Sequence, residues 1–208
     1  MIIELYGLPA SGKSTLANEL EENTEAVVVR RLKINCLIIF WRAIKFLIHH
    51  PIIGFKNLWF IVKNAEYIHD VWNNFFVRYA KYMTAKKLSK QGEIVVLDEG
   101  PRQNLLSVPQ RPLDQAKVNT ILRKLPPTDI CVCFDLPTDI REENIKKRGY
   151  RSRPEYSDKQ YSQFIKYLES INEKVVKLLK NKQNVLMIRD LDARDRVTNE
   201  LVETFVKD

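Results

Sequence analysis

One segment near the start of the chain constrains its fold more than any other. Residues 7–15 read GLPASGKST and match the spacing G-x-x-x-x-G-K-[ST]. The apolar run Ile2 to Tyr6 precedes this segment, and a stretch with leucines at helical spacing follows it. A strand, a glycine-containing turn and a helix in this order favour an α/β fold in which the turn lies at the carboxyl end of a strand.

The turn has the chemistry of a polyphosphate site. Glycine allows the backbone to curl so that successive N–H groups point inward, and the following helix adds the positive end of its dipole. We expect the Lys13 ammonium to bridge the β- and γ-phosphates of ATP, and the Ser14 hydroxyl to bind Mg²⁺. A strand-to-helix turn that binds nothing would not need the whole motif. The residues predicted to contact ATP are Gly7, Pro9, Ala10, Ser11, Gly12, Lys13, Ser14 and Thr15.

Two acidic residues follow a later apolar run. Residues 93–97 close on Asp98 and Glu99, as a Walker B segment does. A carboxylate at the end of that strand would lie beside the phosphate turn. We therefore expect Asp98 to hold the Mg²⁺ ion, through a bound water, and Glu99 to act as a general base. The alternative is that both acids cap a helix.

The remaining apolar runs predict a buried parallel sheet. Five short runs, largely β-branched, are separated by segments with helical spacing. Because these runs are continuous and not alternating, both sheet faces should be covered by helices. The prediction is a three-layer α/β/α P-loop NTPase fold with a five-stranded parallel sheet, forming one domain over residues 1–208. The runs are Ile2 to Tyr6, Ala26 to Val29, Glu93 to Leu97, Ile130 to Phe134 and Val185 to Ile188.

A helical insertion is predicted between the second and third strands, over about residues 33–90. Apolar residues follow helical spacing from Ile34 to Ile48 and again from Ile68 to Met83. Their aromatic stripes fit a core, and the alternatives are a base-stacking or a lipid-binding surface. The helices from Trp41 to Tyr82 are also expected to form the wall of the acceptor site. Charged residues and Pro51 interrupt the apolar runs before the roughly 20 residues that a span requires, so no transmembrane segment is expected.

The composition indicates the charge of the protein's partners and the compartment in which it works. The chain has 34 Lys and Arg against 26 Asp and Glu, a net charge of +8, which favours anionic partners. Three cysteines, two of them inside an apolar run, indicate reduced thiols. The N-terminus lacks the pattern of a signal peptide, and we expect a cytoplasmic protein.

The phosphate turn resembles that of the nucleoside and nucleotide kinases, and the chain is similar to thymidylate kinase, loosely, over most of its length. This resemblance implies the strand order 2-3-1-4-5. The basic residues 146–148 before Gly149 predict a helix that Thr138 opens and that Gly149 ends in the left-handed conformation. The resemblance also implies an arginine-rich lid over about residues 141–158. Arg148 and Arg151 would act there, because a planar guanidinium can bind two phosphate oxygens at once.

The resemblance also assigns two arginines to the acceptor. Arg30, at the end of the second strand, lies where those kinases place an arginine for the acceptor's phosphate. The family's Asp-Arg pair is absent here, since Glu99 follows Asp98, and its arginine would be displaced to Arg102.

The implied activity is transfer of the γ-phosphoryl group of ATP to a small-molecule acceptor, a nucleoside monophosphate by the resemblance. A base such as Glu99 is superfluous for an ionised phosphate but useful for a hydroxyl, so kinases of sugars or nucleosides stay open. A regulatory ATPase without an acceptor is a further alternative. A GTP switch is disfavoured because residues 181–184, NKQN, lack the aspartate of N-K-x-D, and a nucleic-acid partner is not expected. Peripheral membrane contact and a homodimer are left open.

Overall fold

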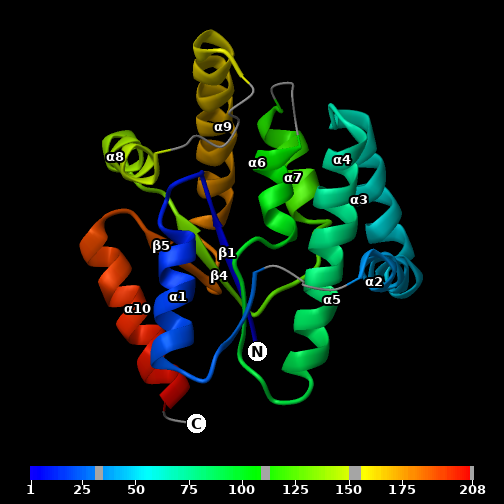
Figure 1. Ribbon diagram of the computed structural model, residues 1–208, viewed down its shortest axis with the longest axis horizontal. Helices are drawn as coiled ribbons and strands as arrows, with labels where there is room; N and C mark the ends of the chain where they lie inside the picture. The colour runs from blue at the N-terminus through cyan, green and yellow to red at the C-terminus, as the bar shows by residue number, and fades with distance from the viewer. Residues whose placement is uncertain (31–34, 109–112, 150–155, 207–208) are drawn as a thin grey trace.

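A computed structural model describes residues 1–30, 35–108, 113–149 and 156–206 (Figure 1). Five parallel strands form one sheet in the order β2-β3-β1-β4-β5. This confirms the predicted fold class and strand order. The strands are β1 (Ile2–Gly7), β2 (Val27–Val29), β3 (Val95–Leu97), β4 (Ile130–Phe134) and β5 (Val185–Ile188).

Helices cover both faces of the sheet, because both faces of its strands are apolar. On one face, α1 and α10 pack on Ile3 and Leu5 of β1. On the other face, α5 packs on Ile2, while α6, α7 and α9 pack on Tyr6. The helices outside the segment between β2 and β3 are α1 (Lys13–Asn23), the 3-10 turn η2 (Pro101–Gln103), α6 (Asn104–Ser107), α7 (Gln115–Leu122), α8 (Thr138–Arg148), α9 (Asp158–Leu179) and α10 (Leu191–Val206).

Five helical segments connect β2 to β3 on one side of the molecule (Figure 1). Their inner side is an aromatic core in which the ring of Tyr79 lies 4.5 Å from that of Phe46 and 4.7 Å from that of Phe75. The sequence did not predict α3, which begins with Pro51 at a position where a missing N–H costs nothing. The segments are α2 (Cys36–His49), α3 (Pro51–Asn64), α4 (Ile68–Val71), the π-helical η1 (Trp72–Val77) and α5 (Arg78–Ser89).

The segment after β4 positions the predicted lid. Helix α8 ends at Arg148, and Gly149 takes the left-handed conformation that was predicted for it, with φ of 71°. Helix α9 begins after Ser157, whose hydroxyl accepts a hydrogen bond from the Gln160 backbone N–H. The lid prediction at Arg151 lies outside the described residues. Of the helices in the described segments, none combines the length and the apolar character that crossing a bilayer would take.

Candidate functional site

The phosphate turn joins β1 to α1 with a backbone that only particular residues permit. A Cβ atom on Gly7 would lie 2.8 Å from the Cβ of Phe134 and 3.0 Å from the Ser11 hydroxyl, closer than such atoms approach. Gly12 has φ of 90°, and Ala10 has φ of 62°, both in the left-handed region. An alanine held in that region is a strained residue of the kind that clusters at ligand sites.

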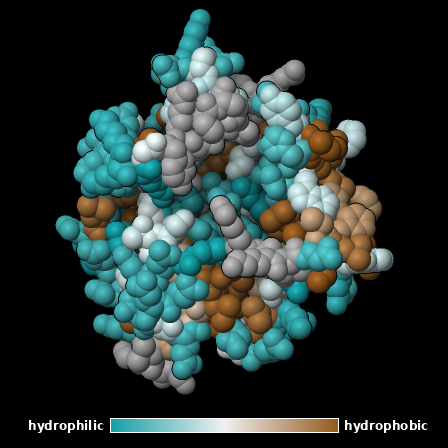
Figure 2. Space-filling view, viewed as in Figure 1, coloured by the Kyte–Doolittle hydropathy of each residue, from teal (hydrophilic) through white to brown (hydrophobic). Residues whose placement is uncertain are grey.

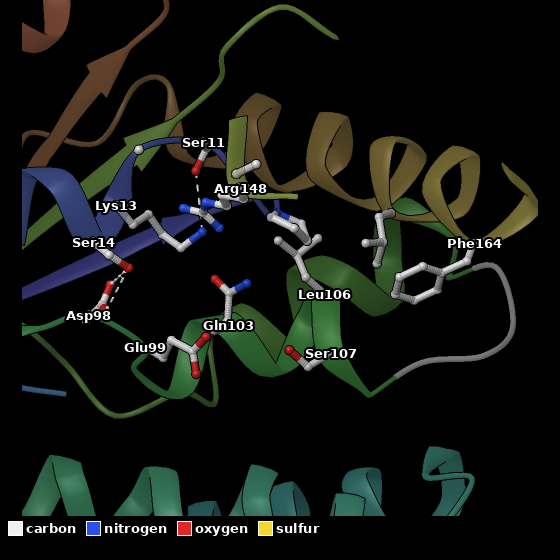
Figure 3. Close-up of a pocket in the computed structure, with 14 residues that line it drawn as sticks. Ser11, Lys13, Ser14, Asp98, Glu99, Gln103, Leu106, Ser107, Arg148 and Phe164 are labelled. Atoms are coloured by element: carbon white, nitrogen blue, oxygen red, sulfur yellow. Dashed lines mark hydrogen bonds between the residues drawn. The ribbon is translucent and has the colours of Figure 1, made fainter. Parts of the chain in front are cut away.

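The turn opens onto the N-terminus of α1. No side chain caps this end of the helix, so its first N–H groups and the positive end of its dipole face the turn. A cavity of about 260 Å³ lies there, which we call the phosphate cavity (Figure 3). Of the predicted ATP contacts, residues 9–14 line it, whereas Gly7 and Thr15 do not.

Lys13 is buried at the floor of the phosphate cavity. Its Nζ lies 2.9 Å from the carbonyl oxygen of Gly7, 2.8 Å from that of Leu8 and 3.4 Å from the Ser11 hydroxyl. Burial lowers the pKa of Lys13 to about 8, although the carboxylates of Glu99 and Asp98 oppose the shift. A bound polyphosphate would favour the protonated ammonium and offset this burial.

Ser14 and Asp98 meet at the mouth of the phosphate cavity. The Ser14 hydroxyl donates to the Asp98 carboxylate, with oxygen–oxygen distances of 3.1 and 3.4 Å. A hydroxyl and a carboxylate oxygen are ligands that suit Mg²⁺, so the pair fits the predicted metal side. The described residues contain no cluster of three or more acidic, His or Cys side chains for a metal. The Ser14–Asp98 pair therefore suits a Mg²⁺ ion that takes its other ligands from phosphates and water.

Glu99 lines the wall of the phosphate cavity that lies across from the phosphate turn (Figure 3). Its carboxylate lies 3.7 Å from the Arg78 guanidinium, and its side chain is half-exposed. Burial alone would raise the pKa of Glu99, but Arg78, Lys81 and Lys13 outweigh burial and lower that pKa. The carboxylate is therefore ionised at neutral pH and can accept a proton.

Arg78 is a site residue that the sequence did not reveal. The guanidinium is buried and donates to the side chains of Asn74, Asn104 and Ser107, with distances of 2.6 Å to Asn104 and 2.9 Å to Ser107. Its spacing to Phe75, Tyr79 and Tyr82 puts Arg78 on the apolar stripe of the helix. A charged residue on such a stripe is the signal that could have identified it, because buried charges need partners.

A second cavity, of about 290 Å³, adjoins the phosphate cavity. Both cavities are lined by Glu99 and Ser107, so these two residues form their common wall. The other residues of the second cavity are mostly polar and come from the helices between β2 and β3. They are Asp70, Asn73, Asn74, Val77, Arg78 and Lys81, and none is an aromatic residue of the predicted acceptor wall.

Arg148 reaches the phosphate cavity from the last residue of α8 (Figure 3). The helix is held against the phosphate turn by the Asn144 amide, which donates to the carbonyl oxygen of Ala10 at 3.0 Å. Arg141, about two turns before Arg148, is buried and paired with Glu169 of α9. Arg148 is thus on the cavity wall, while Arg141 fixes α8 to α9.

The predicted acceptor arginines lie in neither cavity. Arg102 pairs with Glu4 and donates to the Thr128 hydroxyl at 2.6 Å. Glu4 is fully buried, and its charge requires this partner, so Arg102 belongs to the core and not to the substrate side. Arg30 pairs with Glu21 at 2.7 Å and donates to Asn18, both on α1.

Gln103 supports the phosphate turn and was also missed. Its side-chain amide donates to the carbonyl oxygen of Gly7 at 3.1 Å, and its side-chain oxygen accepts from the Gly7 N–H at 3.5 Å. Gln103 also lines the phosphate cavity. An amide can satisfy both backbone groups of one residue, so Gln103 fixes the point where β1 enters the turn.

No protein-family model matches the sequence, and no curated protein matches it. By structure the chain is similar to a deoxyadenosine kinase from M. mycoides with bound dCTP, at 15% identity and a TM-score of 0.50, over 98% of this chain and 100% of the other. A structure of deoxyadenosine kinase from M. mycoides with the products dCMP and dCDP is similar at 14% identity and a TM-score of 0.53, over 98% of this chain and 100% of the other. A structure of that kinase with dATP is similar at 15% identity and a TM-score of 0.50, over 97% of this chain and 99% of the other. At this identity the likeness shows the fold alone, which is that of a P-loop kinase.

Proposed function

We propose that this protein is an ATP-dependent phosphotransferase that moves the γ-phosphoryl group of ATP to a hydroxyl of a small polar acceptor, with nucleosides as the first candidates. One observation carries the proposal: the phosphate cavity and the second cavity share Glu99. A donor in the first cavity and an acceptor in the second would meet at a carboxylate that can take a proton.

The donor side follows from the phosphate turn. Its N–H groups and Lys13 would hold the phosphates of ATP, and Arg148 would add a second cation from α8. Ser14 and Asp98 would hold Mg²⁺, which neutralises phosphate charge when bound. The N–H groups of the turn, Lys13 and Arg148 would each stabilise the negative charge that moves during transfer.

The reaction step would begin at Glu99. Its carboxylate accepts the proton of the acceptor hydroxyl while the hydroxyl oxygen bonds to the γ-phosphorus of ATP. The bond from the γ-phosphorus to the bridging oxygen breaks, and ADP leaves with that electron pair. Lys13 would stabilise the charge that develops on this oxygen.

The second cavity favours a hydroxyl acceptor. An anionic acceptor would bring its charge against the ionised Glu99 at the common wall, whereas a hydroxyl would donate to it. The fold likeness to a deoxyadenosine kinase supports a nucleoside. Arg78 and Lys81 are the observation that favours the other candidate, the nucleoside monophosphate expected from the sequence, because both are buried cations.

The acceptor can be identified with one assay. The protein is incubated with ATP and Mg²⁺, and phosphorus NMR follows pools of nucleosides, sugars and nucleoside monophosphates beside a sample without acceptor. We expect a new phosphomonoester signal only with a hydroxyl pool. Diphosphate in excess of the ADP released, found only with the monophosphates, would replace the hydroxyl proposal. Phosphate release in every sample would indicate a regulatory ATPase.

A variant of Glu99 tests its role directly. Glu99→Gln keeps the shape but removes the base, and should lower transfer to a hydroxyl by about 10²-fold or more while ATP still binds. Glu93→Gln is the matched control, since Glu93 is exposed and lines neither cavity. Unchanged turnover in Glu99→Gln would exclude Glu99 as the base.

A further inference from the structure

Helices α2 and α3 carry an unusual concentration of exposed apolar side chains. In the described part of the chain, every exposed large apolar side chain except Leu191 lies within residues 37–68. Figure 2 shows apolar side chains gathered at the right-hand edge, where Figure 1 places these helices. We define the α2–α3 surface by the outward residues Leu37, Trp41, Ile48, Ile52, Phe55, Trp59 and Val62.

The outer face of α3 is a continuous apolar stripe. Ile52, Phe55, Trp59 and Val62 recur at a helical spacing of three or four residues, and their exposed fractions run from 50% to 70%. The opposite face of α3 carries buried residues, among them the fully buried Ile61. A surface helix of a globular protein needs only one apolar face. The second apolar face of α3 therefore needs a partner.

The charge of this region is of one sign. Residues 26–65 contain no Asp or Glu. On the two helices, Lys45, Lys56 and Lys63 are exposed among the apolar side chains. A helix face with Trp and Phe and with Lys beside them has the side chains of helices that lie in the interface of an anionic bilayer.

We infer that the α2–α3 surface docks on a lipid bilayer that contains anionic headgroups. Each helix has 14 residues, too few to span about 30 Å of hydrocarbon, so the helices would lie along the headgroup layer. Trp41 and Trp59 would enter the interface, where tryptophan is enriched. The exposed lysines would contact lipid phosphates.

A second copy of the chain fits this surface less well. In a twofold dimer the same patch meets itself. The exposed Lys45, Lys56 and Lys63 of one copy would then lie against a patch of the same positive charge, since neither helix carries an acidic residue. Anionic lipid supplies the missing negative charge, and a dimer through this patch does not.

Vesicle binding tests the inference with the full chain. The protein is mixed with vesicles of phosphatidylcholine alone or with phosphatidylglycerol added, and binding is followed by co-sedimentation and tryptophan fluorescence. We expect binding and a blue-shifted emission only with the anionic vesicles, weakened by high salt. Failure to bind them, or equal binding to neutral vesicles, would overturn the inference.

Two pairs of variants locate the contact. Lys63→Glu should weaken vesicle binding at least about tenfold, whereas Lys177→Glu should not, although both lysines are exposed in the last turn of a helix. Trp59→Ser should weaken binding, and Leu191→Ser, outside the surface, should not. If the protein is instead a dimer in solution that Trp59→Ser converts to a monomer, the surface is a subunit interface and the lipid inference fails. Phosphoryl transfer without vesicles should be unaffected, so this test is independent of the proposed activity.

Discussion

The phosphate turn and the α2–α3 surface differ in the kind of side chain that each buries or exposes. In the turn, Lys13 is a charged side chain held in the interior by carbonyl oxygens. On α3, Trp59 is an apolar side chain left 69% exposed. Each residue departs from the usual burial of its type. Burying a charge costs free energy unless partners or a ligand offset it, whereas an exposed apolar patch marks an interaction site. This difference fits the two proposals, a polyphosphate beside Lys13 and an anionic bilayer against the α2–α3 surface.

The strongest loss of activity is expected from a variant of the phosphate turn. Lys13→Ala should lower phosphoryl transfer on the order of 10³-fold, because a cation at the transferred phosphate is lost. The folded state should persist, since burial of this ammonium is itself unfavourable. Turnover and circular dichroism check both statements, with Lys87→Ala, exposed on α5, as the control. Near-normal turnover in Lys13→Ala would refute the phosphate assignment.

Arg102 offers a buried charge whose partner lies within the protein, unlike the partly exposed ion pair of Arg30. Arg102→Met should cost about 3 to 5 kcal/mol of unfolding free energy, because Glu4 would remain buried without its cation. Arg30→Met removes a pair that is partly exposed and should cost at most about 1 kcal/mol. Urea unfolding measures both. Equal losses would contradict the core role of Arg102.

The sequence predicted the parts of this molecule that depend on local pattern. The strands, residues 9–14 of the phosphate cavity and the left-handed Gly149 follow from short spacings. Arg102 could not be placed, because its partner Glu4 is 98 residues away and nothing local marks the pair. Arg78 differs, because its place on the apolar stripe is a local signal, but its partners Asn104 and Ser107 lie in a distant segment of the chain.

The strand order came from family resemblance, and spacing alone did not supply it. Helix α3 was missed because apolar residues occupy both of its faces, which removes the one-sided periodicity that marks an ordinary surface helix. The feature that obscured α3 in the sequence is therefore the feature that supports its docking surface.

A third prediction uses the pKa of Lys13. The ammonium is protonated below about pH 8 and loses its proton above it, while bound phosphates favour the protonated form. ATP affinity should therefore be constant below about pH 8 and fall by up to about tenfold per pH unit above it. Calorimetric titration across this range measures the change. Lys13→Arg, which stays charged, should show no such fall, and a parallel fall in that variant would assign it to another group.

Variants of α3 should distinguish its outward face from its buried face. Trp59→Ser should change the unfolding free energy by no more than about 0.5 kcal/mol, because in the folded protein that side chain contacts mainly water. Ile61→Ala, two residues along the same helix, should cost about 2 to 5 kcal/mol, because Ile61 is fully buried. Urea unfolding compares the two variants in one background. A large loss in Trp59→Ser would mean that Trp59 packs within the folded protein, and α3 would then have no free apolar face to offer a bilayer.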